Sequence, residues 1–401
     1  MGTTGSSRGW LAGCLLALAG TGLAAGSGWT IEPVLTVTGE RTDNVRVAGT
    51  SGESDTIVTT GLLLPLRHET PRTALELSWQ PAREAYRDFG ALNNTTHAVR
   101  LGWRHDASRR ASWTLGAAWD RRERARVRYD EVADDLVALP RTRVDTLSGR
   151  LEGRFDVGRR TRLVAGATWR DTSYDAPRAT GPGGLAVRLA DSSDTGLSLA
   201  FETNLGRRTA FRVRWTGSRI DEGFRGEWDV QRTLVGFVLG SAERLQWTVE
   251  AGAAWTDVRD PGESGAEDSP TWGVGTIGVR GPVGRRSGTL TAGAGIDVAG
   301  SGGTTGASRT TFGYLGWRLP VGRWSQVEVV ARYAERDPLD PAYARTLTRS
   351  YRAAWRAAFS PRFALVLAGE TINQSASGSY LAADATTWSL GIRWSPTAPR
   401  R

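Results

Sequence analysis

The segment LGWRHDASRRASWTLGAAWD, residues 101–120, carries charges but also alternates apolar with small polar side chains. Its second half sets Trp113, Leu115, Ala117 and Trp119 against Ser112, Thr114 and Gly116. Successive side chains of a β-strand point to opposite faces, so this spacing predicts a strand with one apolar and one polar face. HDASRR, residues 105–110, predicts a short turn between two such strands.

The two-residue period recurs along the chain, and the connectors between strands alternate in length. Short ones such as GRR at 158–160 and 206–208 alternate with long polar ones at 129–141, 174–193 and 260–270. Short turns on one side and long loops on the other are typical of an outer-membrane barrel, with the short turns periplasmic. We therefore predict an all-β fold, a transmembrane antiparallel β-barrel of about eighteen strands from Thr30 to Trp394, with about sixteen as the alternative.

A barrel of this size has room for water along its axis instead of a packed core. Lipid outside and water inside would turn Trp, Leu and Ala outward, and Arg, Ser, Thr and Gly inward. A soluble β-sandwich with a tryptophan core is the alternative, but it does not predict the alternation of connectors. Tryptophans expected at the membrane interfaces, where the ring is buried and its N–H solvated, are Trp103, Trp113, Trp119, Trp169, Trp215, Trp255, Trp355 and Trp394.

The inward positions include many arginines, which we expect to form a basic wall in the lumen. They are Arg100, Arg150, Arg154, Arg162, Arg170, Arg212, Arg214, Arg318, Arg332, Arg352, Arg356 and Arg393. Carboxylates expected on the same face are Glu76, Glu152, Glu202, Glu250, Asp297, Glu328 and Glu370. Cross-strand pairing between the two sets would brace the lumen, and arginines left over after pairing would favour anions.

The N-terminal segment resembles a secretory signal peptide, with Arg8 before an apolar run and small residues near 24–28. We predict a signal over 1–28 and a single barrel domain over 29–401. LAGC at 11–14 spells a lipobox, but the apolar run follows Cys14 instead of preceding it. MGTTGS matches a myristoylation site, but an apolar signal segment lies directly behind it, which favours a chance match. If Cys14 leaves with the signal, the mature chain has no thiol or disulfide chemistry.

The sequence predicts no enzyme, cofactor or metal site. His68 and His105 are expected in periplasmic turns and His97 on the outward face, so no Ser/His/Asp set can form in the lumen. GVGTIG at 273–278 lies within a strand and cannot bind a dinucleotide on a helix. The acidic loops at 132–135 and 262–268 lack EF-hand spacing, which favours solvated loops over calcium sites.

The chain has no lysine, and its arginines are spread evenly instead of forming one stripe. This composition is typical of a GC-rich genome and predicts no nucleic-acid partner. The partners expected of a Gram-negative outer-membrane barrel are membrane lipid, lipopolysaccharide and the outer-membrane assembly machinery.

TIEPVLTVTGERTDNV, residues 30–45, resembles the opening of β-barrel porins encoded with exopolysaccharide loci, including barrels associated with PEP-CTERM systems. In that family an alternating strand with a glutamate precedes an Asp-Asn pair, here Glu40, Asp43 and Asn44. The resemblance implies a passive pore that helps a polysaccharide cross or attach to the outer membrane, with polysaccharide or export-system proteins as partners. The alternative is a surface hydrolase or adhesin acting through its extracellular loops.

Overall fold

The computed structural model describes residues 28–45, 52–124, 142–175, 178–180, 186–188, 191–223, 226–241, 243–260, 270–283, 288–300, 307–339, 345–376 and 383–396. A signal peptide over 1–28 therefore lies outside the described residues except for Gly28, and the domain division stays a prediction. No helix among the described residues is long and apolar enough to cross a membrane.

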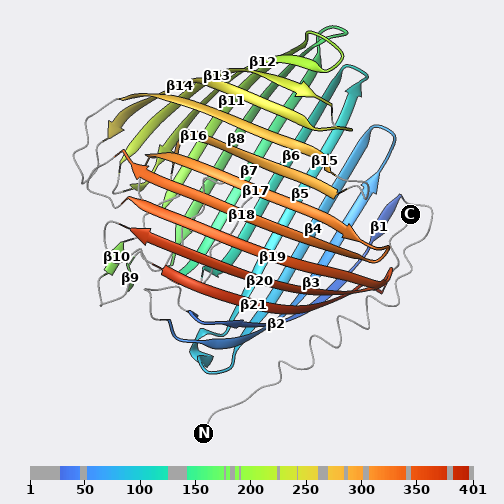
Figure 1. The fold of residues 1–401 in the computed structure, drawn as a ribbon, viewed down its shortest axis with the longest axis vertical. Coiled ribbons are helices and arrows are strands. Elements are labelled where there is room, and N and C mark those ends of the chain that lie inside the picture. The colour runs from blue at the N-terminus through green and yellow to red at the C-terminus, as the bar shows by residue number, and fades with distance from the viewer. Residues whose placement is uncertain are drawn as a thin grey trace.

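One sheet dominates the fold (Figure 1), and its strands follow one another in chain order. The strands are β1 (Trp29–Ile31), β2 (Val34–Thr42), β3 (Asp55–Glu69), β4 (Thr73–Tyr86), β5 (Asn94–Ser108), β6 (Ala111–Arg124), β7 (Thr142–Asp156), β8 (Thr161–Tyr174), β11 (Ser192–Asn204), β12 (Thr209–Asp221), β13 (Glu227–Gly240), β14 (Gln246–Asp260), β15 (Thr271–Val283), β16 (Gly288–Gly300), β17 (Ala307–Val321), β18 (Ser325–Pro338), β19 (Thr346–Ser360), β20 (Phe363–Ala376) and β21 (Ala383–Trp394). A 3-10 turn, η1 (Gly90–Leu92), follows β4.

The sheet closes on itself because β21 pairs with β2, with Leu35 opposite Trp394 and Thr42 opposite Thr387. β1 and β2 both pair with β3 in the same register, and only Glu32 and Pro33 separate them. The predicted antiparallel barrel of eighteen strands is confirmed, with β1 and β2 as one interrupted strand.

The resemblance motif ties the first barrel strand to the last. Asp43 accepts a hydrogen bond from the Thr386 N–H through its carboxylate (2.6 Å) and donates its own N–H to the Thr386 carbonyl (3.1 Å). The Asn44 side chain donates to the carbonyl of Asp384 (2.8 Å). These bonds extend the β2–β21 seam beyond the end of β2, so Asp43 and Asn44 serve barrel closure.

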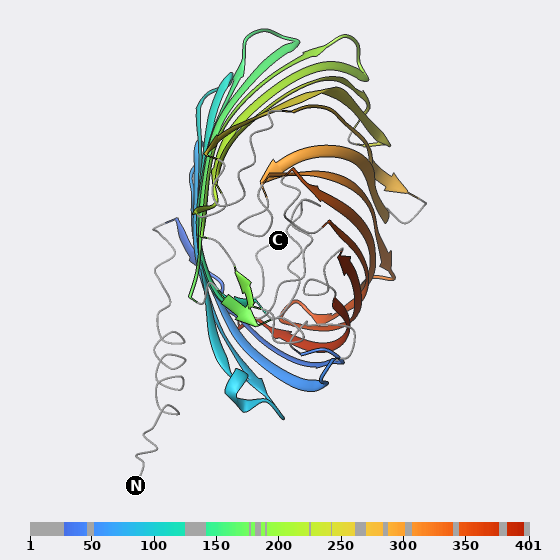
Figure 2. The same ribbon diagram turned by 90° about the vertical axis from the view of Figure 1, so that its left-hand side faces the viewer.

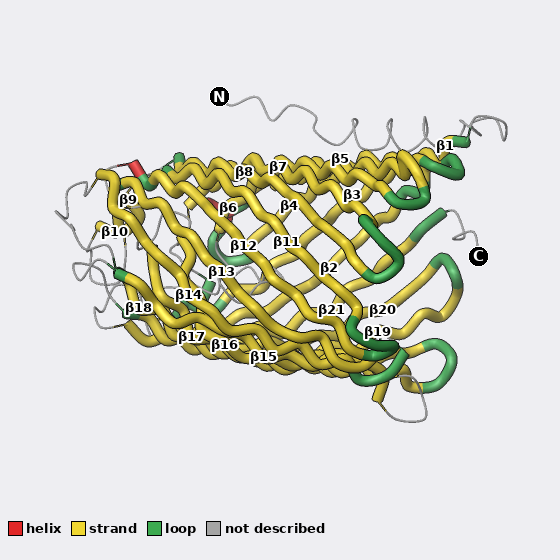
Figure 3. The backbone as a smooth tube through the Cα atoms, turned by 90° about the horizontal axis from the view of Figure 1, so that it is seen from above, coloured by secondary structure: helices red, strands yellow, loops and turns green. Residues whose placement is uncertain are grey.

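The two ends of the barrel differ. Short turns stand at one edge together with the C-terminal end of β21 (Figure 3), and we take this edge as periplasmic. Two further short strands, β9 (Arg178–Thr180) and β10 (Ala186–Arg188), form a separate hairpin in the longest predicted loop. Figures 1 and 2 together place this hairpin over the opposite, extracellular opening.

An apolar cluster occupies the interior beside β12–β16, where water was expected. Trp228 and Val298 are almost fully buried in it, and its buried members are Ile220, Trp228, Val230, Leu234, Ala254, Val274 and Val298. The expectation that no packed core lies inside the barrel is therefore wrong on this side of the lumen.

The cluster forms because the end of β16 leaves its neighbour and passes inside the wall. Pairing between β15 and β16 stops at Gly275 and Ile296, and Asp297 forms an ion pair with Arg232 of β13 instead. The Arg309 guanidinium of β17 lies 5.4 Å from the ring centre of Trp272 on β15. Figure 2 shows the orange strands curving within the yellow-green wall, which makes two layers here and narrows the lumen.

Several outward tryptophan rings lie across a glycine on the neighbouring strand. Gly149 is directly opposite Trp169, and a Cβ built on Gly149 would fall 1.3 Å from the Trp169 ring. Trp113 covers Gly153, and Trp388 covers Gly369, in the same way. The missing side chain lets each indole lie flat against the sheet, as in aromatic rescue of strand glycines.

We predict that Gly149→Ala displaces the Trp169 ring and lowers the free energy of unfolding by about 1 kcal/mol, the scale of an aromatic contact. Gly39→Ala is the control, because Gly39 also faces outward but a Cβ there would meet nothing within 4 Å. The measurement is the denaturant midpoint of the barrel in detergent. Equal midpoints for the two variants would contradict this account of the glycine–tryptophan pairs.

Candidate functional site

The strand register sorts side chains into a lumen face and a lipid face. Residues directly opposite one another in an antiparallel pair point the same way. Arg162, Glu202 and Arg212 form one such row across β8, β11 and β12, and exposed Phe201 belongs to the other face. Followed around the barrel, the register places all the arginines predicted for the basic wall on the lumen face.

The predicted interfacial tryptophans lie on the lipid face. Trp113, Trp169, Trp255, Trp355 and Trp394 are exposed, whereas Trp103, Trp119 and Trp215 are half-buried. On three strands the next outward residue toward the extracellular end is charged: Trp119 precedes Arg121, Trp169 precedes Asp171, and Trp255 precedes Asp257. Tryptophan followed by charge is the order expected where a strand leaves hydrocarbon for water.

The histidines differ partly from expectation. His68 lies in β3 and His105 in β5, not in turns, because both strands keep pairing to within two or three residues of the next strand. Both share the lipid face: His68 is opposite Leu75, and His105 is opposite Trp113. The His97 ring stacks between Trp79 and Trp119, each with a centroid separation of 6.4 Å. Among the described residues, no histidine faces the lumen.

A network of ion pairs braces the lumen wall over β11–β14. Arg212 contacts Glu202 at 2.7 Å, and Arg214 contacts the buried Glu250 at 2.8 Å. These arginines reach Glu250 across β13 because the intervening residue is Gly236, where a Cβ would lie 2.0 Å from the Val249 carbonyl. A carboxylate buried in this way stabilises the wall only while its arginines stay in place.

The other predicted wall arginines fall into three groups. Arg150 pairs with Glu152, Arg162 with Asp156 (2.9 Å), and Arg318 with Glu328 (3.1 Å). Arg170 and Arg332 lie opposite Asp194 and Ser350 in the register. Within the described part of the chain, Arg100, Arg154, Arg352, Arg356 and Arg393 have no carboxylate within ion-pair distance.

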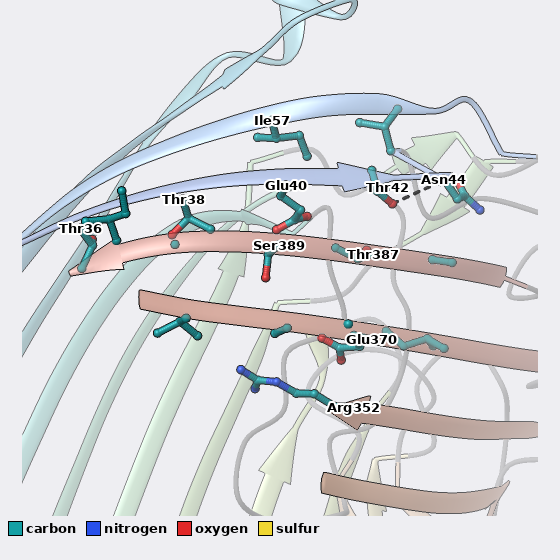
Figure 4. Close-up of a pocket in the computed structure, with 18 of the residues that line it drawn as sticks. Thr36, Thr38, Glu40, Thr42, Asn44, Ile57, Arg352, Glu370, Thr387 and Ser389 are labelled. Atoms are coloured by element: carbon teal, nitrogen blue, oxygen red, sulfur yellow. Dashed lines mark hydrogen bonds between the residues drawn. The ribbon is translucent and has the colours of Figure 1, made fainter. Parts of the chain in front are cut away.

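Arg352 and Arg393 help line a cavity of about 410 Å³ on the lumen face of the seam (Figure 4). Two cross-strand rows form its floor: Thr42–Thr387–Glu370–Arg352 and Glu40–Ser389–Ala368. Thr36 and Thr38 continue the hydroxyl ladder along β2 toward the periplasmic end, where Arg393 lies opposite Thr36. We call this the seam cavity.

The seam cavity presents hydroxyls, carboxylates and guanidinium groups to one space. Such a set can exchange hydrogen bonds with a polyhydroxylated solute, and its charges can orient an ion. Glu40, named by the resemblance motif, is buried and faces this cavity. Among the described residues no cluster of three or more candidate ligands could hold a metal ion. The acidic loops at 132–135 and 262–268 lie outside the described residues.

Several lumen carboxylates are not predicted by the sequence pattern, because each lies near a strand end, where the alternation is hard to follow. Asp106 pairs with Arg104 (3.1 Å), and Asp156 lies opposite Arg162. Asp194 lies opposite Arg170, and Asp120 contacts Arg122. The surplus of positive charge in the lumen is therefore smaller than the sequence indicated.

Comparison with protein-family models and with curated proteins found no match. The chain is similar to solved structures of OccAB4 from Acinetobacter baumannii (9% identity, 92% of this chain and 97% of that chain, TM-score 0.46) and of OccK2 from Pseudomonas aeruginosa (11% identity, 91% and 98%, TM-score 0.46). A BenF-like porin from Pseudomonas fluorescens Pf-5 is similar at 8% identity, 92% and 98% coverage, and a TM-score of 0.48. Identities and TM-scores this low do not indicate which solute the protein transports.

We predict that cysteines at Ala165 and Arg170 label differently. Both lie on β8, but Ala165 shares the lipid face with Leu199 and Arg170 the lumen face with Asp194. In a Cys14→Ser background, Arg170→Cys should react with a water-soluble maleimide in intact vesicles, while Ala165→Cys stays shielded by lipid. Equal reactivity would show that the assignment of faces is wrong.

Proposed function

We propose that the protein is a passive outer-membrane pore that serves an exopolysaccharide pathway. The assignment of a pore rests on the architecture. The protein is a closed barrel of eighteen strands with an apolar outer face and a lumen face of charged and hydroxyl side chains. Closure satisfies the backbone hydrogen bonds of every strand, so lipid can surround it, while the polar face solvates an aqueous path.

The exopolysaccharide link rests on the resemblance at Glu40, Asp43 and Asn44 and is supported by the chemistry of the seam cavity. Threonine and serine rows beside carboxylates match the hydrogen-bonding groups of a sugar chain. The lumen has no nucleophile paired with a histidine among the described residues, so we assign it no reaction. In this proposal the partners are membrane lipid, lipopolysaccharide, the assembly machinery and export-system proteins.

We predict a modest anion preference in planar bilayers that grows as salt is lowered. Many lumen arginines have carboxylate partners, and fixed charge on a wide wall is screened over about 8 Å at physiological ionic strength. Arg352→Ser with Arg356→Ser should weaken the preference, because these arginines have no such partner. The control is Arg318→Ser, which removes an arginine that pairs with Glu328. It should change the reversal potential less than the double substitution does.

Cation preference at low salt would overturn the anion selectivity, and absence of conductance from folded barrels would overturn the pore itself. The pathway link has a separate test. Deletion of the gene should reduce surface polysaccharide, and unchanged polysaccharide would refute that part of the proposal.

A further inference from the structure

Arginine recurs at one structural position of the periplasmic turns. Arg72, Arg110, Arg160, Arg208 and Arg362 each immediately precede the next strand, and we call them the rim arginines. The carbonyl of each accepts a backbone hydrogen bond at 2.7–2.8 Å from an N–H group in a neighbouring strand or, for Arg362, just after β21. The donors are, in the same order, Asp106, Asp156, Asn204, Gly240 and Ser395. These bonds fix the turns, so the rim arginines stand in defined places around the opening.

Two neighbouring turns and the strands β5 and β7 bring several arginines into one cavity of about 510 Å³, which we call the mouth cavity. It lies between the turns β3–β4 and β5–β6 and the periplasmic end of β7, and its volume is that of a typical ligand pocket. Its charged lining residues are Arg72, Arg104, Arg109, Arg110, Arg154, Asp106 and Asp156.

The carboxylates of the mouth cavity already have arginine partners. Asp106 pairs with Arg104 at 3.1 Å, and Asp156 pairs with Arg162 at 2.9 Å. Arg72, Arg109, Arg110 and Arg154 form no ion pair within the described residues, and all four are exposed. The cavity therefore keeps a surplus of guanidinium groups, which bind carboxylates and phosphates in bidentate fashion.

The mouth cavity leads from the rim into the barrel. Arg104 and Arg154 belong to the lumen face, since Arg104 lies opposite Thr114 and Arg154 opposite Ser112. Arg72, Arg109 and Arg110 come from the turns at the edge. An anionic chain arriving from the periplasm would meet the turn arginines first and the lumen arginines next. This direction favours a solute entering the pore over a lipid headgroup bound on the outer face.

We propose that the mouth cavity is an entry site for an acidic polysaccharide, a sugar chain bearing carboxylate groups. The proposal rests on the pore function and names the class of polymer that the pore would take. Several fixed arginines would bind successive charges of one chain, whereas a neutral chain would gain no such bonds. Binding should weaken steeply with salt because it depends on charge.

The test is calorimetric titration of the purified full-length barrel with an oligogalacturonate, beside a maltooligosaccharide of equal length. The charged probe should bind at low salt and the neutral one should not. Arg72→Ser, Arg109→Ser and Arg110→Ser together should weaken binding by about tenfold or more. The matched control is Arg159→Ser, Arg207→Ser and Arg208→Ser, which removes the same charge from two turns outside the mouth cavity and should change affinity by less than about twofold.

Equal losses in the two triple variants would show that the rim attracts anions diffusely, and the entry site would be rejected. Equal binding of the neutral probe, or competition by phosphatidylglycerol nanodiscs, would also overturn the proposal, the latter in favour of a lipid headgroup. Calorimetry measures oligogalacturonate binding independently of the conductance of the pore. Conductance with no oligogalacturonate binding therefore refutes the entry site alone, whereas binding without conductance refutes the pore.

Discussion

Pairing between β2 and β21 closes the sheet and determines the rest of the architecture. A strand in hydrocarbon cannot leave N–H and C=O groups unpaired, so an open edge would be prohibitively unfavourable. The seam joins residues 340 or more positions apart in the sequence. Asp43 and Asn44 extend this register past the end of β2 through side-chain bonds to β21. Closure in turn creates the lumen, and with it the seam cavity and the mouth cavity.

The barrel could be predicted from the sequence because one local rule governs most of the chain. Lipid requires an apolar residue at every second position, and the short and long connectors reveal which end of each strand faces the periplasm. The rule fails for side chains that pack inside the barrel and for strand ends outside the hydrocarbon region, because contact with lipid does not determine the residue type there. Trp228 faces inward and is buried because the end of β16 folds beneath β13–β15, and this contact joins elements that sequence periodicity does not relate. His105 lies in a strand because the backbone pairing between β5 and β6 continues beyond the alternating apolar residues.

The residue types that face the lumen could be predicted from the sequence, but the ion pairs that they form could not. Alternation assigned the arginines to the inner face, yet which of them is neutralised depends on register. Glu250 reaches two arginines only because Gly236 leaves space between them. The wall over β11–β14 is braced by such pairs, whereas Arg352, Arg356 and Arg393 remain available to solute. The rim arginines looked like a consequence of composition, and only the turn geometry shows that they occupy equivalent positions.

An engineered disulfide across the β2–β21 seam tests whether the barrel is closed. Thr38 lies opposite Gly391 across β2 and β21 on the lumen face, within the reach of a disulfide. In a Cys14→Ser background, the pair Thr38→Cys and Gly391→Cys should oxidise to an intramolecular crosslink in the folded barrel. The pair Thr38→Cys and Leu390→Cys, whose side chains point to opposite faces, should not. A crosslink in neither pair, or in both equally, would contradict the closed register.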